Sequence, residues 1–244
     1  MQKICHHIAE PNFQNGWIWL WYDCFSSWCK QFKTFEHKLW DLSDLDVFVQ
    51  RTYPEYYNVY KNLPHNISKI DVAKILLLHH YGGIYCDMDL FCHKNFEHLL
   101  QQKLYLVEEA DKIFVEKNNT FLKLSTKFSN FLMVSREKNN QIWITIVESM
   151  FQKIKHLPYY NYNKEKYVLS TTGPVAIEEI LVEKNLLKEF DVLPCRLFNR
   201  VDGDNGEAIS DAYTTHLNIS MWMKPEKKDV FDSGGEDKII GDYV

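Results

Sequence analysis

Residues 80–89 read HYGGIYCDMD, and the fold class can be predicted from these residues and the helix before them. The preceding residues, Asn66–Tyr81, carry apolar side chains at helical spacing. Gly82 and Gly83 end that helix, because glycine readily adopts the backbone conformations found where helices stop. The apolar run Ile84–Leu90 then predicts a strand. A helix, a glycine turn and a strand are the central unit of an α/β fold.

The same alternation of strands and helices continues on both sides of this unit. We expect further strands at residues 3–8, 36–41, 103–108, 112–116 and 131–135. We expect further helices at residues 45–50, 53–62, 140–156 and 174–187. No repeat or long linker divides the chain. We therefore treat residues 1–244 as one domain, of which the C-terminal segment, about residues 202–244, is largely loop.

The composition is that of a folded globular protein. Hydrophobic residues make up 45% of the chain, and 28 Lys and Arg face 33 Asp and Glu, a formal net charge of -5. This balance gives no reason to expect a nucleic-acid partner. Six cysteines without a CxxC pair favour reduced thiols. The apolar patch Gly16–Tyr22 is too short to span a membrane, so we expect no transmembrane or targeting segment. We therefore expect a cytoplasmic protein, bacterial or viral, or an excised catalytic domain.

Two carboxylates end the central strand. Strict alternation would place Tyr85, Asp87 and Asp89 on one face and apolar side chains on the other. Carboxylates one residue apart on a strand lie roughly 7 Å from each other, and they repel where water is scarce. A divalent cation compensates this repulsion, and oxygen ligands favour magnesium or manganese.

The helix before the glycine turn carries two charges in its apolar stripe, Asp71 and Lys74. Their spacing of three residues permits an ion pair within the helix, which is one explanation for them. The other explanation is a functional site. The residues by themselves favour neither.

Together, Asp71-x-x-Lys74 and residues 80–89 resemble the signature of the DXD sugar transferases, a family that includes fungal Golgi α-mannosyltransferases and is related to glucosylating bacterial toxins. Further segments agree in the expected order: residues 3–6, 38–41, 172–174, His216 and 220–222. The resemblance implies a GT-A type fold, a Rossmann-like mixed sheet flanked by helices. It also implies retaining transfer of a hexose from a UDP- or GDP-sugar to a glycan or other hydroxyl acceptor, with Mn²⁺ or Mg²⁺ as the cofactor.

The resemblance implies roles for individual residues. Asp71, Asp87 and Asp89 are the expected catalytic residues, and Asp71 would hold hydroxyl groups of the donor sugar. The expected metal ligands are Asp87, Asp89, His216 and Ser220. The expected substrate-binding residues are Asp71, Lys74, Gly83, Tyr85, Thr172, Gly173, Ser220 and Trp222.

Two positions depart from the family pattern. Ala9 stands where the opening motif has tryptophan, and Lys74 stands where the family has arginine. Lysine keeps the charge but lacks the planar, bidentate guanidinium. These departures leave the nucleotide open, and they keep a second hypothesis in view, a non-catalytic nucleotide-sugar or carbohydrate-binding protein.

Three other hypotheses concern single features. A magnesium-dependent phosphatase also uses D-x-D at a strand end, but Leu90 and Phe91 do not fit its pattern. The alternating Trp17, Trp19 and Trp21 are expected in the core rather than in a sugar-binding surface. A zinc site would draw on a cluster that fits no common zinc spacing, namely His79, His80, Cys86, Cys92 and His93.

Overall fold

The computed structural model describes residues 1–9, 18–109, 113–117, 120–124, 127–157, 163–199 and 211–217. Its helices are α1 (Ile18–Gln31), α2 (Leu42–Thr52), α3 (Pro54–Lys61), α4 (Asn66–Tyr81), α5 (Gln141–His156), α6 (Lys164–Thr171), α7 (Pro174–Glu183) and α8 (Cys195–Phe198). Its strands are β1 (Ile4–Ile8), β2 (Glu36–Trp40), β3 (Gly83–Cys86), β4 (Leu90–Cys92), β5 (Leu104–Glu108), β6 (Ile113–Lys117), β7 (Thr120–Leu124), β8 (Phe128–Ser135), β9 (Phe190–Leu193) and β10 (Thr214–His216).

A six-stranded mixed sheet forms the centre of the molecule, in the order β2-β1-β3-β8-β5-β9. Strand β8 pairs antiparallel with β3 and β5, whereas the pairs β1–β2, β1–β3 and β5–β9 are parallel. The carboxyl ends of β1, β3 and β5 therefore lie at one edge of the sheet. Two small antiparallel ribbons, β4–β10 and β6–β7, complete the described strands.

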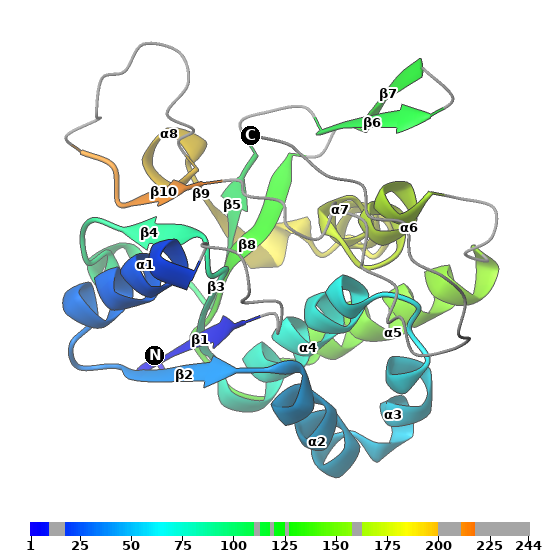
Figure 1. Cartoon of the computed structure of the whole chain (residues 1–244), viewed down its shortest axis with the longest axis horizontal. Coiled ribbons are helices and arrows are strands. Elements are labelled where there is room, and N and C mark those ends of the chain that lie inside the picture. Colours follow the sequence, from blue (N-terminus) through cyan, green and yellow to red (C-terminus); the bar gives the residue numbers. More distant parts are fainter. Residues whose placement is uncertain are drawn as a thin grey trace, which may run out of the picture.

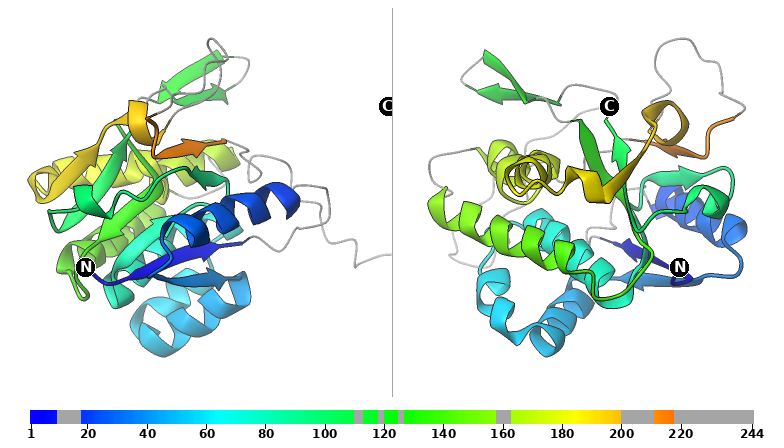
Figure 2. Two further views of the ribbon diagram at one scale, coloured as in Figure 1. Left: turned by 90° about the vertical axis from the view of Figure 1, so that its left-hand side faces the viewer. Right: turned by 180° about the vertical axis from the view of Figure 1, so that it is seen from behind.

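Helices cover both faces of this sheet (Figure 1). On one face α4 packs against α2, α3, α5 and α6, and their side chains join the sheet in the larger hydrophobic core. On the other face lie α1, the β4–β10 ribbon and α8, over a second core that contains Trp28 and Phe96. The views from the side and from behind show these layers separately (Figure 2). The expected class, a mixed α/β sheet flanked by helices, is confirmed.

The glycine turn explains how α4 passes directly into the sheet. Gly82 caps α4 with a φ of 65°, and Gly83 begins β3 with a φ of 93°. A side chain on Gly83 would collide with β1, because its Cβ would lie 2.3 Å from the carbonyl oxygen of Ile4. The second glycine is therefore required for β3 to pair closely with β1.

The sequence patterns predicted α4 with its observed bounds and placed β1, β2, β5, β8, α5 and α7 approximately. They missed α1, α6 and β7, and they missed the short elements β9, α8 and β10. Of the tryptophans expected in the core, Trp21 lies there, Trp19 is 74% exposed, and Trp17 lies outside the described residues. Most of the expected C-terminal loop, residues 202–244, lies outside the described residues. In the described part of the chain, no helix is both long and apolar enough to cross a membrane.

Candidate metal and donor site

The two acidic residues lie in a turn rather than in a strand, so the strand expected over Ile84–Leu90 is wrong. Strand β3 ends at Cys86, and the chain resumes as β4 at Leu90. The amide of Asp87 still donates to the carbonyl of Phe131 on β8, at 2.8 Å, and the amide of Leu90 closes the turn on the carbonyl of Asp87, at 3.2 Å. A turn allows Asp87 and Asp89 to approach more closely than alternate strand residues do.

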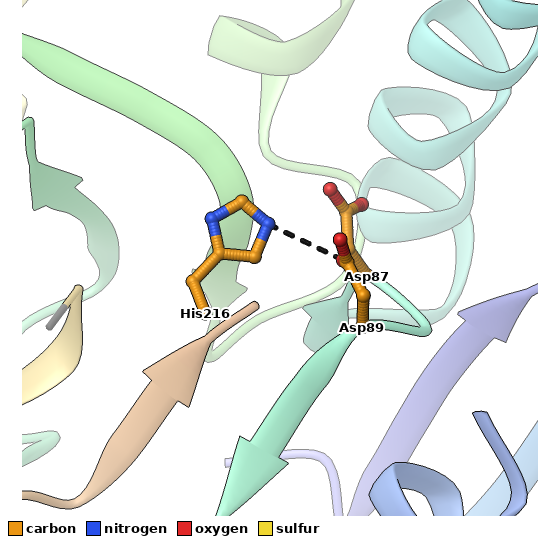
Figure 3. Close-up of side chains that lie close together, drawn as sticks. All are labelled: Asp87, Asp89 and His216. Atoms are coloured by element: carbon orange, nitrogen blue, oxygen red, sulfur yellow. Dashed lines mark ion pairs between the residues drawn. The ribbon is translucent and has the colours of Figure 1, made fainter. Parts of the chain in front are cut away.

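His216 joins these two carboxylates from a distant part of the chain (Figure 3). Strand β10 pairs with β4 so that His216 lies opposite Leu90, and the amide of Leu217 donates to the carbonyl of Asp89 at 3.0 Å. The imidazole Nε2 of His216 lies 3.2 Å from a carboxylate oxygen of Asp89. One ligand atom each from Asp87, Asp89 and His216 lies within 4.8 Å of the others.

Burial sets the electrostatics of this group. The pKa of Asp87 is raised to about 6, chiefly by burial and further by the neighbouring charge of Asp89, although Lys74 opposes the shift. Burial lowers the pKa of His216, but the hydrogen bond and charge of Asp89 outweigh it, so the pKa of His216 is raised overall. The group thus holds excess negative charge, which a proton on His216 or a cation can neutralise.

The donor set fits a divalent cation. Two carboxylates supply hard oxygen ligands and His216 supplies an imidazole nitrogen, a combination that suits manganese and is compatible with magnesium. Three protein ligands leave coordination positions for other oxygen ligands. Among the described residues, Asp87, Asp89 and His216 form the one such group of His, Cys, Asp and Glu.

Asp71 and Lys74 form a buried ion pair behind this group. The ammonium nitrogen of Lys74 lies 2.7 Å from a carboxylate oxygen of Asp71, and their side chains are 3% and 4% exposed. Burial raises the pKa of Asp71, and the charge of Lys74 opposes that shift. The ion pair that the sequence allowed is therefore present, and it lies beside the acidic turn rather than apart from it.

Two further residues hold Asp71 from other elements. The side-chain amide of Asn130 on β8 donates to Oδ1 of Asp71 at 3.1 Å, and the hydroxyl of Thr172 donates to Oδ2 at 3.0 Å. Because an ionised carboxylate has about four acceptor positions, Lys74, Asn130 and Thr172 leave one for a ligand hydroxyl.

Tyr85 connects the ion pair to the acidic turn. Its hydroxyl donates to Oδ1 of Asp87 at 2.5 Å, and the ammonium of Lys74 lies 5.2 Å from the centre of its ring. Burial and the charge of Asp87 hold the pKa of Tyr85 well above its ordinary value, so the phenol remains a donor. Tyr85 therefore positions the side chain of Asp87.

The remaining expected substrate-binding residues fall into three groups. Gly83 lies at the start of β3, at the opposite end of the strand from Asp87. It contacts the backbone of Ile4, so the close pairing of β3 with β1 accounts for a glycine at this position. Gly173 caps the start of α7, and Pro174 follows at the first helical position. Ser220 and Trp222 lie outside the described residues.

The described residues proposed for a zinc site do not form a group of metal ligands. The thiol of Cys86 lies in the apolar second core, 3.3 Å from Nδ1 of His7, as the strand pattern predicted for its face. His79 instead contacts the hydroxyl of Tyr53 at 2.6 Å, on the other side of the sheet. These residues do not converge in the described structure.

Two residues of the site were not expected from any motif. Asn130 contacts Asp71 across 59 positions of sequence, and Phe131 stacks on the ring of His216 with ring centres 4.3 Å apart. Both lie on β8, which is the antiparallel strand between β3 and β5. Because no motif surrounds them, only the pairing of β8 with β3 reveals them.

Comparison with known families agrees with this geometry. Residues 20–106 match the family model described as a glycosyltransferase sugar-binding region containing a DXD motif. The matched range includes the ion pair and the acidic turn. Over this range the chain resembles the DXD glycosyltransferases.

Two relatives are about a quarter identical to this chain over the residues that align. Inositol phosphoceramide mannosyltransferase 1 of Schizosaccharomyces pombe is 24% identical over 192 residues, 79% of this chain and 56% of that protein. An uncharacterized glycosyltransferase of Acanthamoeba polyphaga mimivirus is 26% identical over 200 residues, 77% of this chain and 70% of that protein. The chain thus spans little more than half the length of the fungal relative.

A solved structure titled PaToxG Glycosyltransferase resembles this fold with a TM-score of 0.45 and 16% identity, over 75% of this chain and 70% of that one.

Proposed function

We propose that this protein is a metal-dependent, retaining glycosyltransferase of the DXD type. It moves a hexose from a UDP- or GDP-sugar to a carbohydrate or other hydroxyl acceptor, in the synthesis of a glycan. The observation that supports this proposal most strongly is the convergence of Asp87, Asp89 and His216 within 4.8 Å. Ligand sites of α/β folds form at the carboxyl ends of strands, where Asp87 follows β3.

Each residue of the site has a defined task in this proposal. Asp87, Asp89 and His216 hold the cation, which when bound supplies positive charge for the departing diphosphate. Tyr85 fixes the orientation of Asp87 through its hydroxyl. The free acceptor position of Asp71 takes a hydroxyl of the donor sugar, while Lys74, Asn130 and Thr172 keep that carboxylate in place.

The names of relatives suggest which sugar to test first. The fungal relative is named a mannosyltransferase, as is a second related protein of Schizosaccharomyces pombe. We therefore place GDP-mannose beside UDP-sugars at the head of the donor panel. For the acceptor, we propose no more than a compound that carries a hydroxyl group.

The experiment is release of nucleoside diphosphate, without acceptor, from GDP-mannose, GDP-fucose, UDP-glucose and UDP-galactose. We expect one donor to be cleaved in the presence of Mn²⁺ and the cleavage to stop when a chelator is added. Silence across the panel together with tight, metal-dependent binding of a nucleotide sugar would replace this proposal with a non-catalytic binding protein. Proton NMR of the first transfer product tests retention, since the anomeric coupling distinguishes the two configurations.

A further inference from the structure

Strand β10 carries His216, and this strand is too short to hold the imidazole in place by itself. It spans three residues, Thr214–His216, and it pairs along one side with β4. A two-stranded ribbon is marginally stable in water unless the rest of the fold supports it. The position of His216 therefore depends on what holds β10 to its other neighbours.

The single turn of α8 holds β10 and the residue before it. The amide of Tyr213 donates to the carbonyl of Leu197 at 2.8 Å. The hydroxyl of Thr214, which is fully buried, donates to the carbonyl of Phe198 at 2.6 Å. Helix α8 has only four residues, however, and a helix of this length is not stable by itself. It must in turn be fixed to the sheet.

Glu109, the residue after β5, makes this connection. The side-chain amide of Asn199, the residue after α8, donates to Oε1 of Glu109 at 2.8 Å. The hydroxyl of Ser129 on β8 donates to Oε2. The backbone amide of Glu109 donates to the carbonyl of Lys127 at 2.8 Å, which extends the pairing of β5 with β8. One carboxylate thus joins β5, β8 and α8 at the carboxyl edge of the sheet (Figure 1).

Burial makes the hydrogen bonds of Glu109 important for the site. Asn199 and Ser129 are 3% and 4% exposed, so water cannot replace either donor. Hydrogen bonds to an ionised carboxylate are stronger than those between neutral groups, and their loss inside a protein is costly. Ser129 and Phe131 face the same side of β8, because alternate residues of a strand do so. Glu109 contacts the first and His216 stacks on the second.

We propose that Glu109 and Asn199 are positioning residues for His216. They fix α8, and through α8 they fix β10, so that the imidazole reaches the two carboxylates. This inference rests on the proposed function for the cation that the imidazole helps to hold. Asp87 and Asp89 lie in the turn after β3, which is closed by its own hydrogen bonds. When the contact between Glu109 and Asn199 is lost, the third ligand is therefore the one that is displaced.

The first measurement is the NMR signal of the imidazole Cε1–H of His216, without metal or nucleotide. In the full chain labelled with carbon-13 at histidine Cε1, it is the signal that His216→Gln removes. Stacking on Phe131 should shift it upfield, and Asn199→Ala should return it toward the value of an exposed histidine. Asn140→Ala is the matched control and should leave it in place. The side-chain amide of Asn140 also donates to a glutamate, Glu137, but it caps α5.

Binding of Mn²⁺ alone, followed by electron paramagnetic resonance, tests the consequence for the cation. Asn199→Ala should weaken it by about tenfold, as is found when side chains that orient metal ligands are removed. Glu109→Gln keeps an oxygen that accepts from Asn199, so it should weaken binding less than Glu109→Ala does. Adding Asn199→Ala to His216→Gln should cause no further loss, because Asn199 acts through His216. A merely structural role would weaken binding in that background as well.

Three results would overturn the inference. They are an unmoved His216 signal in Asn199→Ala, equal Mn²⁺ binding by Asn199→Ala and Asn140→Ala, and a further loss of binding in the double variant. Should Asn199→Ala fail to fold, Glu109→Gln takes its place in both measurements.

The proposed function is tested separately, by donor cleavage without acceptor. Metal-dependent cleavage by the parent protein, combined with a His216 signal and Mn²⁺ binding that ignore Asn199, would remove this inference alone. A parent protein that binds no Mn²⁺ and cleaves no donor, but in which Asn199→Ala moves the His216 signal, would remove the proposed function and keep Asn199 as a positioning residue for His216.

Discussion

The ammonium of Lys74 lies 2.7 Å from the carboxylate of Asp71, and the pair is almost completely buried. Removing two ions from water is costly, and their attraction offsets this cost only when the pair is intact and further hydrogen-bonded. Asn130 and Thr172 supply those hydrogen bonds to Asp71. At the position where the DXD transferases have arginine, Lys74 thus forms a buried ion pair that is part of the core.

Replacing one member of this pair should destabilise the protein strongly. Lys74→Met leaves the buried charge of Asp71 without its cation, so we expect the free energy of unfolding to fall by about 3–5 kcal/mol. Urea denaturation measures it. The double variant Lys74→Met with Asp71→Leu should recover part of the loss, since no buried charge remains. A double variant less stable than Lys74→Met would contradict this explanation.

The two glycines of the turn should differ in their tolerance of a side chain. Gly83→Ala forces its Cβ to 2.3 Å from the backbone of Ile4, so we expect a loss of about 4 kcal/mol or more, or no soluble protein. At Gly82 the nearest atoms lie 3.1 Å away, and the main cost is its positive φ, about 1–3 kcal/mol. Thermal unfolding of both alanine variants tests this order. Equal melting temperatures would show that β1 and β3 can separate.

The region around the acidic turn was predictable because its signals are local. A long apolar helix, two glycines and two carboxylates follow one another within residues 66–89. The break between β3 and β4 was not predictable, because the apolar run continues through Met88 and Leu90. Only the closing hydrogen bonds from Leu90 to Asp87 and from Asp87 to Phe131 end the strand.

Contacts between distant segments explain the other differences. Asn130 reaches Asp71 through the pairing of β8 with β3, and nothing in its own neighbourhood signals that contact. His216 was selected from the family resemblance rather than from local physics. The exposure of Trp19 depends on α1 being a helix, since a strand would have placed it on the same face as Trp21.

A buried histidine should make stability fall in acid. The pKa of His7 is lowered from 6.5 to about 3, first by burial and then by the charges of His37 and His6. Below pH 6.5 the unfolded chain therefore binds a proton that the folded chain excludes. This lowers the free energy of unfolding by about 1.4 kcal/mol for each pH unit until the folded pKa is reached.

Urea denaturation between pH 7.5 and pH 5 measures this slope. His7→Gln should reduce it by about 1.4 kcal/mol for each pH unit well below 6.5, because the titrating group is gone. His98→Gln, at an exposed position, is the control and should keep the slope of the parent protein. Parallel lines for His7→Gln and the parent would mean that His7 does not stay neutral in the fold.

Asp89→Asn should abolish donor cleavage while preserving the fold. The amide keeps the size of the side chain but loses the charge that binds a cation, so we expect a loss of about 100-fold or more. Circular dichroism should match that of the parent protein, since Asp89 lies in a partly exposed turn. Asp191→Asn, an exposed acid on β9, should cleave donor at the normal rate. Unchanged cleavage by Asp89→Asn would exclude Asp89 as a metal ligand.

In the proposed function, Asp87, Asp89 and His216 hold the cation that serves the diphosphate. Anomalous scattering from Mn²⁺, in crystals soaked with manganese and GDP or UDP, tests it most directly. We expect one manganese peak in contact with these three side chains and with diphosphate oxygens. A nucleotide bound with its manganese elsewhere, or bound at the D-x-D turn without any peak, would contradict the assignment.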